Sequence, residues 1–282
     1  MKKTILSTLC FLLVSCFMFF ADAGTRIVVL GSSTAAGAGV SDSNRAWVNH
    51  YRTSLHSIDP THTVTNLAKG GYTTCAIMPT GTDPYNTGNH ILEVDTERNI
   101  TKALSLSPNA IIINMPTNDV SNGIPVATQM KHFATIIDLA KAAGVKVWIT
   151  TSQPHNFGEK YDGPYNEEHQ PDIWKQAARD QFKELTDSIL NKYGEYALDF
   201  YTPIATEDGY SFIRPEYDSG DGVHLNDAAH DILFNIVKNA NIPEIAGSTP
   251  VEISTTPIYI NFGPAEAGLD SWNNVNNQAS GY

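Results

Sequence analysis

Short aliphatic runs recur along the chain, and each is bounded by polar or glycine-containing segments. The runs lie at 26–30, 63–67, 110–114, 145–150 and 196–200. Continuous aliphatic runs of this length are typical of strands that are buried on both faces of a parallel sheet. We therefore expect five strands.

Segments with helical periodicity lie between and after these runs. Apolar residues recur at three- and four-residue spacing over 46–58, 91–106, 126–143, 172–193 and 226–240. Gly144 and Gly194 are candidate helix C-caps, and the last segment opens with an Asn or Asp suited to an N-cap. The alternation of strand and helix predicts an α/β protein, a three-layer α/β/α sandwich around a five-stranded, mostly parallel sheet of flavodoxin-like type.

The first residues are typical of a targeting segment rather than of the fold. Two lysines precede an apolar run over 5–20, which ends in Ala-Asp-Ala at 21–23. This layout predicts a signal peptide over residues 1–23 and a secreted or periplasmic protein. An alternative remains, because the Leu-Val-Ser-Cys that ends at Cys16 resembles a bacterial lipobox. In that case Cys16 would anchor a lipoprotein at the cell surface.

The end of the chain differs in composition from the expected domain at 24–240. Residues 241–257 are rich in Pro, Ser and Thr and are interpreted as a linker. Residues 258–282 begin like a β-domain but are too few to bury a core of their own. This segment either packs on the main domain or is the start of a truncated accessory domain.

The net charge of the chain limits the classes of partner that it can bind. The sequence has 18 Lys and Arg against 30 Asp and Glu, a net charge of −12. An acidic surface repels nucleic acid and anionic lipid, so we expect no nucleic-acid partner and a membrane association only through a lipid on Cys16. After cleavage of the signal peptide, Cys75 is the one cysteine left, so no intrachain disulfide can form. We interpret Cys75 as a buried thiol.

The carboxyl ends of parallel strands meet at one edge of a sheet, so the residues after each expected strand are candidates for a site. The first run continues into Gly-Ser-Ser-Thr-Ala-Ala-Gly-Ala-Gly at 31–39. This stretch lacks the Gly-Lys-[Ser/Thr] ending of a phosphate loop and does not complete a G-x-G-x-x-G fingerprint. It is therefore interpreted as a strand-to-helix turn that presents a serine hydroxyl and a backbone N–H.

Residues after three other expected strands have side chains or backbone groups that could act together with this serine. Gly70 and Gly71 let the backbone approach a ligand closely, and Asn118 offers a side-chain amide donor. Past the fifth strand, Asp221 precedes His224 by three residues in a glycine-containing turn. A carboxylate at this spacing can accept the Nδ1–H of the imidazole and leave Nε2 free to act as a base.

These residues, in this order, resemble the conserved sequence blocks of the SGNH or GDSL-type hydrolases. The resemblance covers about residues 26–240, and it implies the SGNH hydrolase fold and ester hydrolysis without metal or organic cofactor. By this resemblance Ser33 is the nucleophile, His224 the base and Asp221 its partner. The oxyanion hole would consist of the N–H groups of Ser33 and Gly71 and the amide of Asn118.

Two positions depart from the family pattern. Ser32 stands where the family usually has Asp, which leaves a second serine as an alternative nucleophile, although the register of the motif selects Ser33. Pro116 stands where the family usually has Gly. Because proline lacks an N–H and fixes φ, the loop that carries Asn118 can follow a different path.

Two other functions compete with ester hydrolysis. Asp221, His224, Asp227 and His230 form a ladder of candidate metal ligands, but helical spacing favours a surface pair or a cap for Asp227 and His230. The chain also lacks a zinc motif such as H-E-x-x-H. A non-catalytic glycan-binding module on the same scaffold is the second competitor, and the presence of every group needed for catalysis argues against it.

The loops at the expected site edge suggest the substrate. Residues 79–90 and 154–174 supply aromatic side chains among polar ones: Tyr85, Phe157, Tyr161, Tyr165 and Trp174. This mixture suits a sugar ring better than an acyl chain. We therefore expect a carbohydrate O-acetyl esterase acting on a small-molecule or polysaccharide ester, with a lipid-directed esterase or thioesterase as the alternative.

Overall fold

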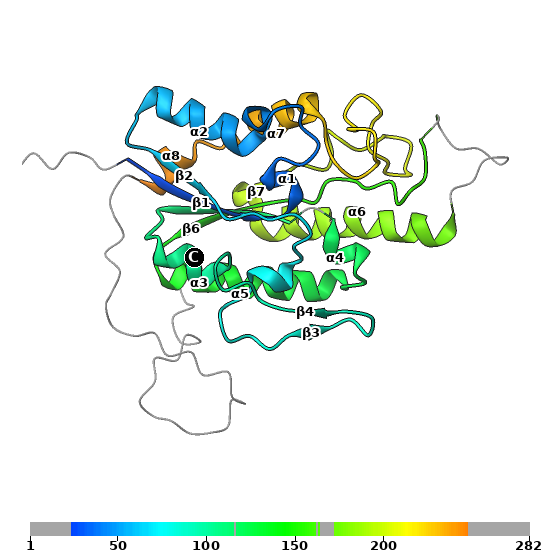
Figure 1. The fold of residues 1–282 in the computed structure, drawn as a ribbon, viewed down its shortest axis with the longest axis horizontal. Helices are drawn as coiled ribbons and strands as arrows, with labels where there is room; N and C mark the ends of the chain where they lie inside the picture. The colour runs from blue at the N-terminus through cyan, green and yellow to red at the C-terminus, as the bar shows by residue number, and fades with distance from the viewer. Residues whose placement is uncertain (1–23, 116, 162, 164–171, 248–282) are drawn as a thin grey trace, which may run out of the picture. The chain divides into compact units, whose positions relative to one another are not determined.

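A computed structural model describes residues 24–115, 117–161, 163 and 172–247 (Figure 1). Five strands form one parallel sheet: β1 (Arg26–Gly31), β2 (Thr63–Asn66), β5 (Ala110–Asn114), β6 (Lys146–Thr150) and β7 (Ala197–Leu198). Their order across the sheet is β2-β1-β5-β6-β7. The α/β fold and the five-stranded sheet expected from the sequence are confirmed, and every pairing in the sheet is parallel.

Helices cover both faces of the sheet (Figure 1). On one face lie α2 (Trp47–Ile58), α7 (Asp227–Asn239) and α8 (Ile242–Ala246), and on the other lie α3 (Ile100–Ser105), α5 (Val126–Ala142) and α6 (Ile173–Tyr193). Alternate residues of each strand point to opposite faces. Ile27 and Val29 of β1 therefore pack in the first core, whereas Val28 and Leu30 pack in the second. Burial on both faces explains why the central strands β1 and β5 are continuously aliphatic.

The helix ends follow the polar residues that cap them. Asn226 accepts a hydrogen bond from Ala229 N, and Asp172 accepts hydrogen bonds from the N–H groups that open α6. Such side chains satisfy N–H groups that have no partner within the helix. The expected helices at 172–193 and 226–240 are confirmed, each starting one residue later than expected because its first residue is the cap.

The prediction of a helix over 91–106 is wrong for the first half of that range. Ile91–Leu92 forms strand β4, which pairs antiparallel with β3 (Tyr85–Asn86), and α3 begins only at Ile100. Asn99 caps α3 by accepting a hydrogen bond from Lys102 N at 2.9 Å. The spacing of apolar residues predicted a helix here. That spacing carries no information about the cross-strand partner, β3, that holds Ile91 and Leu92 extended.

The compact domain extends into the segment expected as a linker. Ile242, in α8, is fully buried, and Lys146 Nζ donates a hydrogen bond to Ile245 O at 2.5 Å. Residues up to Ala246 therefore pack on the sheet domain instead of leaving it at residue 241. The expected signal peptide, the lipobox cysteine and the segment 258–282 lie outside the described residues.

Two further expectations concern membranes and cysteine. Among the residues that the structure describes, no helix combines the length and apolar character needed to cross a bilayer. Cys75 is a buried thiol, as expected. Burial raises the pKa of Cys75 to about 11, with the nearby charge of Asp119 acting in the same direction, so the thiol stays protonated.

The strand order reverses direction between β1 and β5. From β1 the chain crosses to β2 on one side, and then returns to β5 on the other. In open parallel sheets this switch point leaves a crevice beyond the carboxyl ends of the two central strands, and ligands bind there. Short helices α1 (Ser33–Ala36) and α4 (Asn118–Ser121) begin just past β1 and β5. The candidate residues of the sequence analysis lie on these helices and on the loops beside them.

Candidate active site

The turn between β1 and α1 presents one serine and buries the other. Ser32 is fully buried, and its N–H donates to Asn114 O at the end of β5. Ser33, the first residue of α1, is half-exposed. The N–H of a first helical residue has no partner within its helix and favours an anion. Ser33 therefore offers a reachable hydroxyl and an N–H at one point.

The two glycines after β2 pass beside this serine. A Cβ built on Gly70 would lie 3.9 Å from the Cβ of Ser33. Gly71 has φ of 83°, in the left-handed region, and no described atom lies within 4 Å of the position a Cβ would take there. The loop therefore brings backbone close to Ser33 and leaves open space beside Gly71.

Asn118, which lies after β5, forms hydrogen bonds with residues that follow β1 and β2. Its Nδ2 donates to Ser32 Oγ at 2.6 Å and to Tyr72 O at 2.9 Å, so both amide hydrogens have protein acceptors. Tyr72 follows the glycines after β2, and Ser32 directly follows β1. Asn118 is thus brought to the candidate site, where it contacts Ser32. Pro116, because of which this loop can follow a different path from the family's, lies outside the described residues.

Asp221 and His224 form a close pair. Asp221 Oδ2 lies 2.7 Å from His224 Nδ1, and Oδ1 accepts hydrogen bonds from the N–H groups of His224 and Val223. Partial burial raises the pKa of Asp221, but the hydrogen bonds from His224 and Val223 outweigh it and lower the pKa to about 2. The carboxylate is therefore ionised at physiological pH and can hold the ring through Nδ1.

The segment after α1 lies directly against this pair. A Cβ on Gly39 would come within 2.9 Å of the Cβ of His224 and 2.4 Å of Leu225 O. Only glycine fits this approach, and its φ of 92° is also in the region that favours glycine. The second glycine of the G-x-G at 37–39 thus lets the chain pass His224, rather than binding phosphate.

Gln153 links the serine turn to the histidine loop, and the sequence analysis missed it. Its Oε1 accepts from Thr34 Oγ1 and its Nε2 donates to Val223 O, each at 2.6 Å, and the side chain is buried. Thr34 follows Ser33 in the chain, and Val223 precedes His224. Gln153 follows β6, the one strand end from which the sequence analysis took no site residue.

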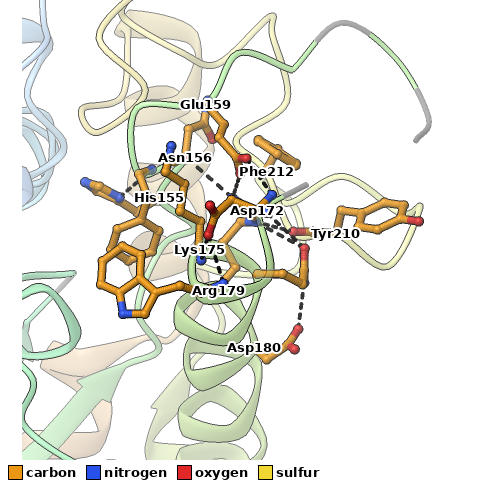
Figure 2. Close-up of polar contacts among 12 residues, drawn as sticks. His155, Asn156, Glu159, Asp172, Lys175, Arg179, Asp180, Tyr210 and Phe212 are labelled. Carbon is orange, nitrogen blue, oxygen red and sulfur yellow. Dashed lines mark hydrogen bonds and ion pairs between the residues drawn. The ribbon is translucent and has the colours of Figure 1, made fainter. Parts of the chain in front are cut away.

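A buried arginine, Arg179, connects the loop of Asn156 and Glu159 to the loop of Tyr210 and Phe212 (Figure 2). Arg179 of α6 is fully buried, donates to Tyr210 O and Glu159 Oε2, and lies over the ring of Phe212. Arg179 Nη1 also lies 3.4 Å from Asn156 O. Bonding a buried cation to several acceptors offsets the cost of removing its charge from water.

Asn156 connects the Arg179 network to the loop that carries Asp221 and His224. Its N–H donates to Gly222 O at 2.8 Å, and its Oδ1 accepts from Ile213 N. The neighbouring His155 is close enough to interact with both members of the Asp221–His224 pair. Burial lowers the pKa of His155 to about 4, opposed by the charge of Asp221, so this ring is neutral at physiological pH. The sequence analysis gave neither residue a role in the site.

Asp119 ties the glycine loop to the start of α4. The carboxylate is buried and accepts hydrogen bonds from both N and Oγ1 of Thr74, and Thr74 Oγ1 lies 2.7 Å from His132 Nδ1. Burial raises the pKa of Asp119 to about 6, although the hydrogen bonds from Thr74 act to lower it. This buried carboxylate therefore anchors the loops on either side of the Ser33 turn.

The four candidate metal ligands, Asp221, His224, Asp227 and His230, do not come together at one point. Asp227 accepts hydrogen bonds from Ser41 N and Oγ, and His230 Nδ1 accepts one from Trp47 N. His230 is fully buried, so the expectation of a surface pair is wrong for it, because the imidazole accepts the N–H that opens α2. Within residues 24–247, as far as they are described, no three His, Cys, Asp or Glu side chains group as metal ligands.

The expected loop aromatics divide into packed and exposed residues. Tyr85 packs edge-on against His132, and Phe157 stacks on Phe182 of α6 at 5.8 Å. Trp174 contacts Phe157 but keeps 68% of its surface exposed. Tyr165 lies outside the described residues. Packing of the loops therefore accounts for Tyr85 and Phe157, and leaves Trp174 available to a ligand.

The raised pKa of Asp119 predicts how stability depends on pH. Because the unfolded carboxyl ionises at lower pH, the free energy of unfolding should fall as pH rises from about 4 to 6, by at most about 3 kcal/mol from this group. Asp119→Asn keeps an acceptor for Thr74 but cannot ionise. Urea unfolding across this range should show the wild-type protein losing stability relative to Asp119→Asn. Parallel curves for the two proteins would contradict the assignment.

The sequence model of the GDSL-like lipase/acylhydrolase family matches residues 29–232. The match spans the Ser33 turn, the glycine loop, Asn118 and the Asp221–His224 pair. No curated protein matches the chain by sequence.

Solved structures of esterases and acylhydrolases share the fold of this chain. A lipase/acylhydrolase from Enterococcus faecalis is 18% identical with a TM-score of 0.52, covering 80% of this chain and 98% of its own. The psychrotrophic esterase EstA from Pseudoalteromonas sp. is 14% identical with a TM-score of 0.51 (79% and 100%), and an acetyl xylan esterase is 16% identical with 0.50 (77% and 100%). At these identities the likeness shows the fold alone. With the family match and the geometry above, the chain belongs to the GDSL-like lipase/acylhydrolase family and is a hydrolase that acts on esters.

Proposed function

We propose that this hydrolase is a secreted serine esterase that removes O-acetyl groups from carbohydrates, with Ser33, His224 and Asp221 as its catalytic residues. The observation that carries the proposal is the 2.7 Å pairing of Asp221 with His224, on a loop that Gln153 ties to the turn of Ser33. A carboxylate, an imidazole and a reachable hydroxyl are the groups that nucleophilic ester hydrolysis requires.

In this mechanism Ser33 Oγ attacks the ester carbonyl carbon while His224 Nε2 accepts the hydroxyl proton. His224 then donates that proton to the departing alkoxide, and a water molecule repeats the sequence to release the acid and free Ser33. Asp221 accepts the Nδ1–H throughout, and its low pKa keeps it ionised for this role.

The negative charge of the tetrahedral intermediate would be held by the N–H groups of Ser33 and Gly71 and by the amide of Asn118. To donate to the oxyanion, Asn118 exchanges its hydrogen bond with Ser32 Oγ for one with the substrate. A neutral hydroxyl releases an amide more readily than the carboxylate usual at this position of the family. Each oxyanion donor lowers the barrier by about 3–4 kcal/mol.

Burial supports Ser33 over Ser32 as the nucleophile. Ser32 is fully buried and its Oγ is already bonded to Asn118, whereas Ser33 is half-exposed beside Gly70. A nucleophile must reach the substrate carbon at contact distance. Ser32 is better suited to holding Asn118 than to attacking an ester.

Three features support a carbohydrate ester as the substrate. The exposed Trp174, in the first turn of α6, lies among amide side chains. The acidic chain is poorly suited to anionic lipid, and an apolar leader favours secretion. The same scaffold also serves an acetyl xylan esterase.

Replacing the two serines separately tests the mechanism. Ser33→Ala should lower kcat on p-nitrophenyl acetate at least about a thousandfold, because no other group forms the acyl-enzyme. Ser32→Ala should lower it by no more than about tenfold, the loss of one hydrogen bond to Asn118. A Ser33→Ala enzyme as active as wild type would exclude this nucleophile, and loss of activity confined to Ser32→Ala would transfer the role to Ser32.

Comparing the hydrolysis of short-chain and long-chain acyl esters tests the proposed substrate class. The wild-type enzyme should hydrolyse p-nitrophenyl acetate with kcat/KM about tenfold above the octanoate, since extra methylene groups gain binding energy only in an apolar channel. It should also release acetate from acetylated xylan. Preference for octanoate would redirect the proposal to lipid esters.

Gln153 should act through the position of His224 relative to Ser33. Gln153→Leu is expected to lower kcat by about 10- to 100-fold with little change in KM, because small displacements of catalytic groups are costly. Gln129→Leu is the matched control, since Gln129 is equally buried and its side chain donates to Ile124 O rather than to the loops of Ser33 and His224. If the two variants lose stability and kcat alike, Gln153 has only a structural role.

A further inference from the structure

A cavity of about 400 Å³ opens where α4, α6 and the β3–β4 hairpin meet. Its lining comes from the turn of the hairpin, from the end of α4 and the residues after it, and from the first turns of α6. The lining residues are Thr87, Asn89, His90, Val120, Ser121, Asn122, Gly123, Trp174, Ala177, Ala178 and Gln181. The cavity therefore borders the helix that begins with Asn118.

The chemistry of this lining suits an uncharged, hydroxylated ligand. The lining contains no Asp, Glu, Lys or Arg, although such residues make up 17% of the chain. Amide, imidazole and hydroxyl groups surround the indole of Trp174 instead. Within the described part of the chain, the side chains of Asn89 and His90 form no hydrogen bond, so both have donors and acceptors to offer. A charged ligand would find no counterion here, and a long acyl chain would bury these polar groups without partners.

Trp174 is held in place although it is exposed. Its ring meets Phe157 edge-on at 6.0 Å, and Phe157 stacks on Phe182, which is fully buried in the domain. A braced aromatic ring loses little conformational freedom when a ligand binds to it. Its exposed surface can pack against the apolar face of a sugar ring while neighbouring amides bond the hydroxyls.

The cavity is coupled to the catalytic edge of the sheet through α4. Asn122 in its wall donates from Nδ2 to the backbone oxygen of Asn118, whose amide contacts Ser32. At 1.5 Å per residue, Ser121 in the cavity wall lies only about 5 Å along the helix axis from Asn118. A chain of sugars bound here would lie beside the ester-cleaving site.

Two other cavities among the described residues fit this role less well. One is lined by Val145 and Lys146 at the amino end of β6, away from the catalytic residues. Another borders Asp221 but is lined by Glu159, Lys160 and Asp218 as well, and this charged lining does not match a neutral saccharide.

We propose that the cavity beneath Trp174 binds an unmodified, neutral sugar unit of the substrate, next to the unit that carries the acetyl ester. The inference rests on the proposed function for the identity of the ester, but binding of the sugar itself can be measured without any catalysis.

Calorimetric titration with unacetylated xylohexaose, mannohexaose and cellohexaose tests the site directly, with oligogalacturonate as the charged counterpart. At least one neutral oligosaccharide should bind, and oligogalacturonate should not. Trp174→Ala should raise Kd about tenfold, which corresponds to about 1.4 kcal/mol. The control is Ile173→Ala, because Ile173 is 88% exposed and does not line the cavity, and it should leave Kd within about twofold.

Catalysis provides the second readout. On the acetylated form of the oligosaccharide that binds, Trp174→Ala should raise KM about tenfold with kcat little changed. Ile173→Ala should leave both constants, and the activity on p-nitrophenyl acetate, at wild-type values. Asn89→Ala should show the same pattern more weakly, which guards against an unexpected folding effect at Trp174.

The outcomes separate this inference from the proposed function. A wild-type enzyme that deacetylates oligosaccharides while Trp174→Ala and Asn89→Ala behave identically to it would overturn the cavity's role and leave the function intact. Binding of neutral oligosaccharides that depends on Trp174, without their deacetylation, would support the cavity and overturn the ester assignment. No binding of any neutral oligosaccharide, or tighter binding of oligogalacturonate, would overturn the inference.

Discussion

The parallel pairing of β1 with β5 is the interaction on which the rest of the site depends. Their register brings Gly31 opposite Asn114, and the ladder continues past the strands through the hydrogen bond from Ser32 N to Asn114 O. Because the strand order reverses between these two strands, no crossover helix fills the space beyond their ends. The Ser33 turn and the helix of Asn118 therefore lie together at an open edge of an otherwise buried sheet.

The histidine reaches this edge by a different route. Its loop follows β7 by more than twenty residues, so the sheet does not fix its position. Buried polar side chains do so instead: Gln153 bridges Thr34 and Val223, and Asn156 accepts Ile213 N while donating to Gly222 O. Behind them the buried Arg179 holds the same loops (Figure 2). Such groups are costly to bury unless fully bonded, so a network of this kind specifies one arrangement of the loops.

Environment gives groups of the same type different pKa values. Asp221 is bonded by N–H groups at a partly open position and has a pKa of about 2, whereas the fully buried Asp119 has a pKa of about 6. His155 is held neutral by burial near the Asp221–His224 pair. The carboxylate at the pair is therefore reliably charged, while the adjoining imidazole of His155 adds no competing positive charge at physiological pH.

The sequence by itself determined the five strands, most of the helices and the candidate site residues, because burial pattern, caps and the Asp221-to-His224 spacing are local properties. It could not determine the β3–β4 hairpin, which depends on a cross-strand partner, or the packing of α8 through Ile242. Nor could it identify Gln153, Asn156 or Arg179, whose partners lie far along the chain and carry no motif. Only the tertiary structure decided that Ser32 is buried against Asn118 while Ser33 is reachable, since adjacent serines differ only in the surroundings that the folded chain gives each of them.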